Sequence, residues 1–163
     1  MNYEIVKMPD DRITLSMTMK AIDIVDSSMG EGYFANQLGR HSKGWIVVQG
    51  SFSKPEVIAY ASIVKENDDC ILKCAAVHPE HRGKGIGTEL VKARLEYLGD
   101  QGCDVVKSYA WIINGKCPAE KPLKTNGFYF VEEVEAFYKN SNMPCLVCGD
   151  VCKCAAKIFE KKL

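Results

Sequence analysis

The segment HRGKGIG, residues 81–87, combines three glycines with two cationic side chains, Arg82 and Lys84. Glycine adopts positive φ angles without strain and lets the backbone come close to a bulky ligand. If a helix begins near Thr88, its unpaired N–H groups and the positive end of its dipole face the same segment. These residues therefore predict a binding site for an anion of the size of a pyrophosphate.

The spacing of these glycines separates the segment from two common nucleotide-binding motifs. A P-loop requires G-x-x-x-x-G-K-[ST], and no lysine in the segment has that spacing. A dinucleotide-binding G-x-G-x-x-G motif requires glycine at position 88 or 90, where the chain has Thr88 and Leu90. Taken alone, the segment is also compatible with a strand-to-helix turn that needs glycine only for its geometry.

A second group of chemically active residues lies in PCLVCGDVCKC, near the end of the sequence. A C-x-x-C-G turn can hold two thiolates on one side of a metal ion, and a second close pair can complete a tetrahedral S4 site. We therefore expect a metal site, with zinc preferred over an iron–sulfur or other metal centre. A reduced loop without metal and a redox-active C-x-x-C are the open alternatives. The predicted ligands are Cys145, Cys148, Cys152 and Cys154.

The composition limits the class of protein and of partner. The 163 residues include 21 basic and 21 acidic side chains, so no overall charge attracts the chain to nucleic acid or to an anionic membrane. The first residues lack the apolar core of a signal peptide, and no run approaches the roughly 18 apolar residues of a membrane span. We therefore expect a cytoplasmic protein without nucleic-acid or membrane partners. Its eight cysteines should be thiols or metal ligands rather than a disulfide framework.

Apolar periodicity and turn residues predict the elements that position these groups. Their order implies an α/β (α+β) domain built around a mixed sheet, without a linker that divides residues 1–163. Strands are expected at 3–8, 44–50, 56–66, 70–77, 104–113, 128–138 and 154–161. Helices are expected at 11–29, 31–41 and 88–98, with a broken short helix or loop at 118–127. The last two strands should pair as an antiparallel hairpin.

The stretch AAVHPEHRGKGIGTEL, residues 75–90, resembles the acetyl-CoA pyrophosphate loop of the GNAT superfamily of N-acetyltransferases. The family pattern [QR]-x-x-G-x-[GA] is met by Arg82, Gly85 and Gly87, and Val77, Pro79, Gly83 and Ile86 meet its extension. A weaker match continues to NGF at 126–128. The resemblance implies a mixed, mostly antiparallel sheet of six to seven strands flanked by helices, in one N-acetyltransferase domain. The cysteine-rich knuckle, residues 144–154, would then lie in the connection between the last two strands.

The resemblance also implies how acetyl-CoA binds. In the family, the strand before the loop splays from its neighbour at a bulge, and the pantetheine arm pairs with the exposed backbone. Asn114 lies two residues before the position of the family's asparagine and is placed with the cofactor-binding residues. Carried over, the resemblance puts the backbone of Ala75, Ala76 and Val77 along pantetheine, and the amides of Arg82, Gly83, Lys84, Gly85, Ile86, Gly87 and Thr88 around the pyrophosphate.

The proton donor departs from the family pattern. A tyrosine often protonates the coenzyme A sulfur in the family, but Leu123 occupies its position here. Cys117, Tyr109 or water are the candidate donors in its place. No general base is assigned, since Asp68 and Asp69 fall in an expected turn. His81, beside the loop, is expected to face water.

The function implied by the resemblance is transfer of an acetyl group from acetyl-CoA to a primary amine of a small molecule or peptide. The family's usual route is direct attack in a ternary complex, with a backbone N–H near Val77 polarising the thioester carbonyl. The missing tyrosine and the cysteine knuckle leave an alternative open, an acyl-CoA-binding metal or thiol sensor with little catalysis. A homodimer through an exposed strand edge is also left open.

Overall fold

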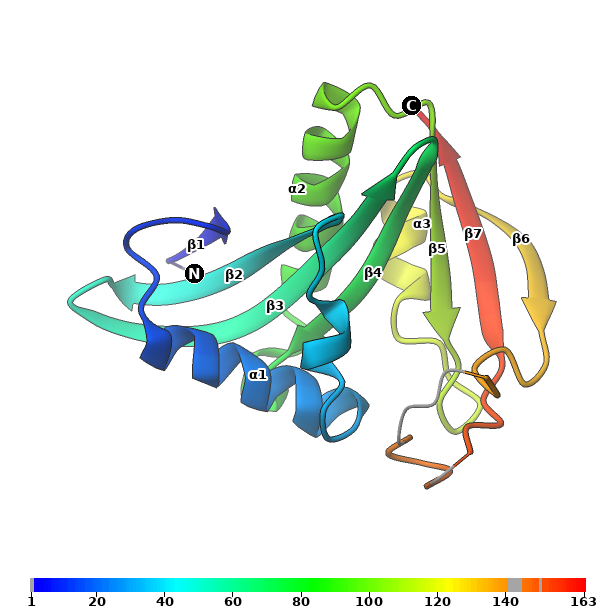
Figure 1. Cartoon of the computed structure of the whole chain (residues 1–163), viewed down its shortest axis with the longest axis horizontal. Coiled ribbons are helices and arrows are strands. Elements are labelled where there is room, and N and C mark those ends of the chain that lie inside the picture. The colour runs from blue at the N-terminus through cyan, green and yellow to red at the C-terminus, as the bar shows by residue number, and fades with distance from the viewer. Residues whose placement is uncertain (1, 141–144, 150) are drawn as a thin grey trace.

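The computed structural model describes residues 2–140, 145–149 and 151–163 and contains a seven-stranded sheet in the order β1-β2-β3-β4-β5-β7-β6 (Figure 1). Neighbouring strands are antiparallel except for β4 and β5, which are parallel. The predicted mixed, mostly antiparallel sheet is therefore confirmed. Its elements are β1 (Tyr3–Lys7), α1 (Leu15–Met29), η1 (Phe34–Gln37), β2 (Ser42–Ser51), β3 (Lys54–Glu66), β4 (Asp69–Val77), η2 (Pro79–His81), α2 (Ile86–Asp100), β5 (Val105–Trp111), α3 (Glu120–Thr125), β6 (Tyr129–Val134) and β7 (Ala156–Lys162).

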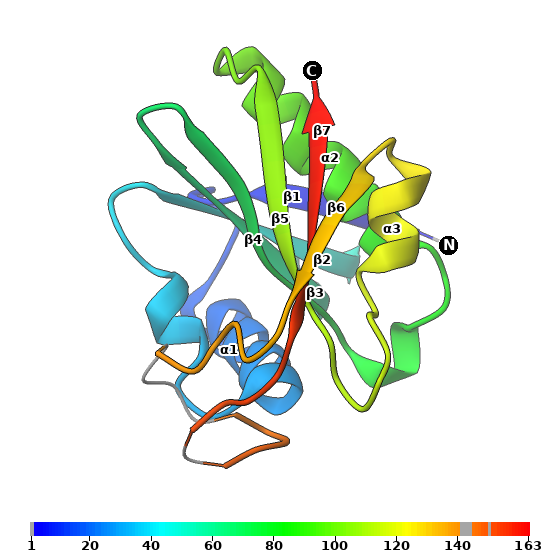
Figure 2. The same ribbon diagram turned by 90° about the vertical axis from the view of Figure 1, so that its right-hand side faces the viewer.

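The helices cover opposite faces of the sheet, with α1 on one side and α2 and α3 on the other (Figures 1 and 2). Alternating strand residues separate the two cores: Trp45 and Val47 pack toward α2, whereas Ile46 and Val48 pack toward α1. This period of two is the pattern of a sheet buried on both faces. Among the described residues, no helix has the length and apolar character that crossing a bilayer requires.

The segment after α1 contains a shorter helix than the sequence predicts. A helix was expected at 31–41, but only η1, a single 3-10 turn, forms there. The carboxylate of Asp26 accepts hydrogen bonds from the backbone N–H groups of Gly32 (3.1 Å) and Phe34 (2.9 Å). These bonds stabilise a turn where the expected helix would begin. Gly30 and Gly32 also adopt non-helical backbone angles, so the helix expected at 31–41 does not form.

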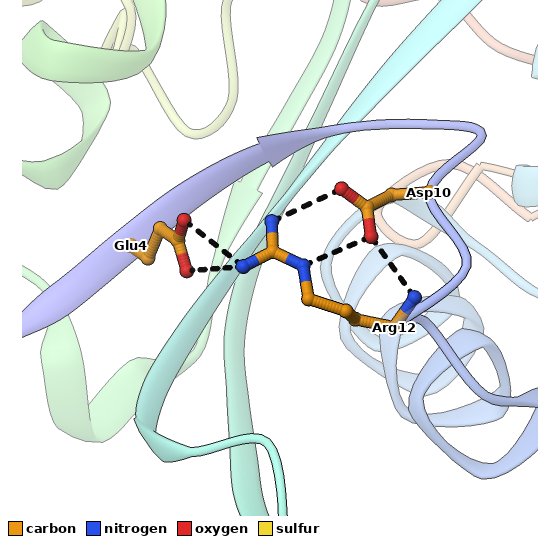
Figure 3. A network of polar contacts seen from close by, with 3 residues as sticks. All are labelled: Glu4, Asp10 and Arg12. Carbon is orange, nitrogen blue, oxygen red and sulfur yellow. Dashed lines mark hydrogen bonds and ion pairs between the residues drawn. The ribbon is translucent and has the colours of Figure 1, made fainter.

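An exposed cluster of charges fixes the chain between β1 and α1 (Figure 3). The guanidinium of Arg12 lies between two carboxylates, 3.3 Å from Glu4 Oε2 and 3.0 Å from Asp10 Oδ2. Hydrogen bonds from Arg12 lower the pKa of Asp10 to about 2. The favourable contribution of Asp10 is therefore present above its ordinary pKa and disappears as the pH falls toward 2. Solvent screens all three groups, so the cluster orients the chain more than it stabilises the fold.

Cys70 and Cys103 form a disulfide, so the expectation that all eight cysteines are thiols or metal ligands is wrong for this pair. The two residues are 33 positions apart in sequence, yet their Cα atoms are 6.4 Å apart. The reason is topological. The crossover through α2 makes β5 parallel to β4, which brings Cys103, two residues before β5, beside Cys70 near the start of β4.

A β-bulge separates β4 from its regular pairing. One residue of β3, Ser62, lies opposite two residues of β4, Lys73 and Cys74. On its other side, β4 pairs with β5 only up to Leu72 and Ser108, and the two strands then diverge (Figure 1). We call the diverging ends of β4 (residues 73–77) and β5 (residues 109–111) the fork. The splayed strand implied by the family resemblance is therefore present.

A buried arginine holds the bulge. Arg94 on α2 is only 3% exposed, and its Nη1 donates to the carbonyl oxygens of Ser62 (3.1 Å) and Cys74 (3.2 Å). Its Nε donates to the carbonyl of Leu90. None of the ion pairs among the described residues includes Arg94. Burial lowers the pKa of Arg94 to about 10, so it still carries its charge at neutral pH. The bulge therefore depends on one cation that is paired only with carbonyl groups.

We expect Arg94→Met to lower the free energy of unfolding by about 2–4 kcal/mol, because the buried carbonyls of Ser62 and Cys74 lose their donor. Methionine retains much of the apolar volume, so the loss reports on hydrogen bonds more than on a cavity. Urea unfolding followed by circular dichroism measures the effect.

The matched control is Arg12→Met, which removes an exposed arginine with two charged partners. It should change stability far less than Arg94→Met, because water replaces the lost contacts. Equal stability of the two variants would show that the bulge does not depend on the Arg94 guanidinium.

Candidate functional site

The edge of β4 that faces the fork offers unpaired backbone groups. His78 N–H donates to the carbonyl of Ile58 on β3 (2.8 Å), and Ala76, two residues earlier, is in the same phase of the ladder. The backbone of Ala76 is therefore directed toward β3. Ala75 and Val77 have the opposite phase, so their N–H groups face the fork. Of the three residues predicted along pantetheine, these two present their backbone to that side.

The loop after β4 leads into the N-terminus of α2, and its amides are free from Gly83 onward. The amide of Arg82, predicted to contact the pyrophosphate, instead donates to the carbonyl of Pro79 (3.4 Å) and closes the turn η2. Gly83 and Gly85 have φ angles of +74° and +84°, and no heavy atom lies within 4 Å of where a Cβ would be. Gly85 is the N-cap and provides no side-chain cap. Glu89 N–H donates to the carbonyl of Gly85, as the first helical hydrogen bond of α2. The N–H groups that precede it, from Ile86, Gly87 and Thr88, have no helical acceptor and are suited to an anion.

The two cationic side chains of the loop have different roles. Arg82 Nε donates to the carbonyl of Val77 (2.9 Å), and its Nη2 lies 3.3 Å from Ser28 Oγ on α1. The guanidinium therefore fastens the loop to α1 and occupies the Val77 carbonyl. Lys84 is exposed and can direct its ammonium group toward a bound anion.

Asn114 lies just beyond β5, in a turn closed by two hydrogen bonds between Ile113 and Lys116 (2.8 and 3.0 Å). Its φ angle is +51°, a left-handed conformation that asparagine tolerates better than most residues. The turn sits at the open end of the fork, because the strands diverge toward their C-terminal ends. Asn114 is therefore near the fork but outside the pyrophosphate loop.

Leu123, at the family's tyrosine position, is a core residue. It is 2% exposed and packs in the core on the α2 side of the sheet. Cys117, a predicted substitute for the tyrosine, is half-buried and packs at the edge of the same core. Burial and the neighbouring Glu120 carboxylate raise the pKa of Cys117. Cys117 thus remains a neutral thiol at physiological pH.

A tyrosine that the sequence analysis did not select reaches the fork. Tyr138 O–H donates to the backbone carbonyl of Tyr109 (3.1 Å). Ile112 N–H donates to Ala155 on the β7 side, so Tyr109, three residues earlier on β5, points its backbone groups toward β4. The Tyr138 hydroxyl therefore lies on the β5 edge of the fork. The Tyr109 ring stacks on Phe137, with ring centroids 5.2 Å apart.

The Tyr138 hydroxyl is protonated over the physiological range. Burial, followed by the nearby Tyr33 hydroxyl, raises the pKa of Tyr138 above its ordinary value. A neutral phenol can donate a proton or a hydrogen bond, whereas a phenolate cannot. Tyr138 is therefore a neutral donor facing the fork.

The histidines beside the loop differ from expectation. His81 was expected to face water, but it is 8% exposed, and its Nε2 lies 3.3 Å from Glu56 Oε1. It is buried because the single turn η2 folds it back against the start of β3. His78 Nδ1 accepts a hydrogen bond from Glu80 N–H and caps this turn. Asp68 and Asp69 lie at the β3–β4 turn, the end of β4 away from the fork.

The four clustered cysteines come together in the connection between β6 and β7. Their sulfur atoms all lie within 4.8 Å of one another. Cys145 and Gly149 exchange two backbone hydrogen bonds of 2.9 Å, which closes the C-x-x-C-G turn. Residues 144 and 150 of the predicted knuckle lie outside the described residues. Within the described part, the predicted ligand set is assembled in space.

The cysteine cluster lies at the same end of the sheet as the fork. Cys154 lies beside the side chain of Trp111, the last residue of β5. Cys152 lies near Tyr33, which follows α1, and near Tyr138. Figures 1 and 2 both show this connection beside the C-terminal end of α1. The cluster therefore adjoins the face of the fork that is opposite α2.

Two residues that shape the fork, Arg94 and Tyr138, were not predicted from the sequence. Arg94 is buried on α2 between the turns of Leu90 and Leu98. A charge four residues from each leucine was a readable signal of a buried cation. Tyr138 gave no such signal, because its partner on β5 is 29 residues away.

The comparisons with known proteins agree with this geometry. The model of the Acetyltransferase (GNAT) family matches residues 17–121. Among solved structures, an IAA acetyltransferase from Bacillus cereus ATCC 14579 has a TM-score of 0.71 and 18% identity, with 99% of this chain and 100% of that chain covered. The ribosomal-protein-S18-alanine N-acetyltransferase from Escherichia coli has a TM-score of 0.71 and 16% identity, with 99% and 94% covered.

A GNAT family acetyltransferase from Elizabethkingia anophelis with acetyl-CoA bound has the same TM-score of 0.71 at 15% identity, with 99% of both chains covered. The sequence has no match among curated proteins. At these identities, the structural neighbours establish the fold alone. Since the family model covers more than half of the sequence and the fold agrees, the chain belongs to the GNAT acetyltransferase family.

Proposed function

We propose that this protein transfers an acetyl group from acetyl-CoA to a primary amine of a small molecule or peptide, in the cytoplasm. The observation that carries the proposal is two sets of free backbone N–H groups. One set lies on the fork edge of β4, at Ala75 and Val77, and the other runs from Gly83 to Thr88 at the start of α2. Such an arrangement suits a long ligand with an amide-rich arm and a diphosphate, which is the chemistry of coenzyme A.

In this proposal, pantetheine pairs with Ala75 and Val77 as an additional strand in the fork. The diphosphate accepts hydrogen bonds from the amides of residues 83–88, and Lys84 neutralises part of its charge. A backbone N–H near Val77 polarises the thioester carbonyl. Asn114, at the open end of the fork, would contact the cofactor from the other side.

The proposed reaction is direct attack within a ternary complex. The amine nitrogen, in its neutral form, bonds to the thioester carbonyl carbon, and the tetrahedral intermediate then expels the coenzyme A thiolate. The nitrogen loses one proton and the sulfur gains one, so the products are an amide and free coenzyme A. Holding both substrates in the fork supplies much of the acceleration through proximity.

Tyr138 is the proposed proton donor to the departing thiolate. It replaces the function of the family tyrosine, whose position is filled by buried Leu123. The support is its hydroxyl, which is neutral and hydrogen bonded to a carbonyl on the β5 edge of the fork. A thioester inserted between β4 and β5 would bring the sulfur toward that edge. Cys117 is the weaker candidate, because it packs at the edge of the α2-side core and no hydrogen bond joins it to the fork among the described residues.

The amine acceptor would approach from the α1 face, between η1 and the β6–β7 connection. The chain's balanced charge favours neither a polyanionic nor a polycationic acceptor. One structural neighbour acetylates the alanine of ribosomal protein S18, according to its name, which makes peptide amines a reasonable first panel beside small amines.

The alternative, an acyl-CoA-binding sensor with little catalysis, is separated from the enzyme by one comparison. Thermal stabilisation by acetyl-CoA is measured together with coenzyme A release over a panel of amines. Turnover with any amine, above the rate without acceptor, supports the transferase. Stabilisation without turnover across the panel supports the sensor.

We expect Gly85→Ala to raise the dissociation constant of acetyl-CoA at least about tenfold. Alanine is strained at the φ of +84°, and its methyl group occupies space that the diphosphate approaches. Gly102→Ala is the matched control, since Gly102 has a φ of +82° and open space around it at the other end of α2. Calorimetry should find normal affinity in the control, and weakened binding in both variants would contradict a local role for Gly85.

We expect Tyr138→Phe to lower kcat at least about tenfold, with little change in the KM for acetyl-CoA, because only the transferable proton is removed. Tyr129→Phe is the control, as it loses a hydroxyl hydrogen bonded to Glu160 on the exposed edge strand. Cys117→Ala is the rival variant. A tenfold loss in Cys117→Ala with normal turnover in Tyr138→Phe would reverse the assignment.

A further inference from the structure

We propose that Cys145, Cys148, Cys152 and Cys154 bind one zinc ion, which fixes the connection between β6 and β7 at the acceptor side of the fork. The sulfur of Cys154 lies 3.8 Å from that of Cys145 and 3.6 Å from that of Cys148. A tetrahedral zinc ion with Zn–S bonds of about 2.3 Å holds its sulfurs roughly 3.8 Å apart. The spacing therefore fits four ligands of a single ion.

The compactness of the cluster argues against a multinuclear centre. All four sulfurs lie within 4.8 Å of one another. In an iron–sulfur cluster, several irons and bridging sulfides separate the cysteine ligands, which places them farther apart. A single iron would fit the same four sulfurs. Acetyl transfer involves no oxidation or reduction, however, so a redox-active metal has no role in it. Zinc has no redox chemistry and favours this ligand set.

Backbone N–H groups around the sulfurs complete the site. Lys153 N–H donates to Cys148 Sγ (3.4 Å). The backbone amides of Cys148 and Val147 lie beside the Cys145 thiol, and that of Cys154 lies beside the Cys152 thiol. Four thiolates around a divalent ion carry a net charge of −2, which these N–H groups reduce. Outer hydrogen bonds of this kind orient the ligands of metal sites.

In this cluster two of the cysteines are buried and the apolar side chains are exposed, which is the reverse of the usual pattern of burial. Cys145 and Cys152 are buried, whereas the apolar side chains of Leu146, Val147 and Val151 are 57%, 45% and 58% exposed. The sulfurs therefore occupy the centre that apolar side chains would fill in a small hydrophobic core. Four thiols without a metal contribute little to the stability of a folded loop, whereas a metal ion bound by all four contributes strongly to it.

The cysteines of the cluster are distinct from the disulfide-bonded pair of the same chain. Cys70 and Cys103 are bonded, while all four cluster cysteines are free. The cluster thus has four separate sulfur ligands available.

The position of the cluster gives the ion a structural task. β6 ends at Val134 and β7 begins at Ala156, so the connection is long and carries Tyr138 near its start. The cluster side of this connection contacts Trp111 at the end of β5. An ion that closes the connection would hold it against β5 and thereby steady the acceptor side of the fork.

Metal analysis of untagged protein purified without oxygen tests the proposal. We expect about one zinc per chain in the wild type and less than about 0.1 in Cys148→Ser/Cys154→Ser, which removes the two more exposed ligands. Cys117→Ser is the matched control, a half-buried cysteine outside the cluster, and should retain about one zinc. Cobalt(II) added to metal-free wild type should give the absorption of a tetrahedral sulfur site. Less than about 0.1 metal in the wild type, with no cobalt spectrum, would overturn the proposal, and stoichiometric iron would overturn the choice of zinc.

Hydrogen exchange tests whether the ion fixes the connection. Removing zinc should expose the amides of residues 145–149 and 151–154 to exchange at least about tenfold faster, while α2 stays protected. Unchanged exchange would refute the structural task. Acetyl-CoA affinity of Cys148→Ser/Cys154→Ser should stay within about twofold of the wild type, since the diphosphate site is on α2. Failure of acetyl-CoA binding in the zinc-loaded wild type would instead refute the proposed function and leave the metal site standing.

Discussion

The separation of β4 from β5 is the constraint on which the functional arrangement of this protein depends. A continuous parallel sheet would satisfy the backbone of both strands and leave no polar edge for a ligand. The β4–β5 pairing ends at Leu72, where β4 begins its bulge opposite Ser62 of β3, and the guanidinium of Arg94 satisfies the carbonyls of Ser62 and Cys74. The chain thus accepts the burial of a cation without a carboxylate partner, and the result is a pair of strand edges with different chemistry.

The two edges of the fork face each other with complementary groups. The β4 edge presents N–H groups of Ala75 and Val77, and the Val77 carbonyl is occupied by Arg82. The β5 edge presents the Tyr109 carbonyl, already joined to the Tyr138 hydroxyl. A thioester between them would meet hydrogen-bond donors at its carbonyl on one side and a proton donor for its sulfur on the other. Polarisation and protonation would therefore come from opposite strands.

The sequence predicted what depends on neighbouring residues and missed what depends on distant ones. The glycine loop, most strands and the cysteine knuckle were readable, because their signals lie within about a dozen residues of chain. The Cys70–Cys103 disulfide and the Tyr138–Tyr109 hydrogen bond join positions 33 and 29 residues apart. Arg94 is an intermediate case, visible as a charge on an apolar stripe, yet its carbonyl partners appear only when the bulge has formed.

The position of Tyr138 connects the metal proposal to the catalytic one. Its hydroxyl must stay at the edge of β5, yet it lies in a connection that runs from Val134 to Ala156. Ordering so long a connection costs conformational entropy, and the exposed apolar side chains of its cysteine-rich part recover little of that cost by burial. A cross-link near the far end shortens the free chain and reduces this cost. The four cysteines lie beside Trp111 and close to the start of β7. A cross-link at this place would lower the entropy cost of ordering the connection. A zinc ion there would steady the proton donor without touching either substrate.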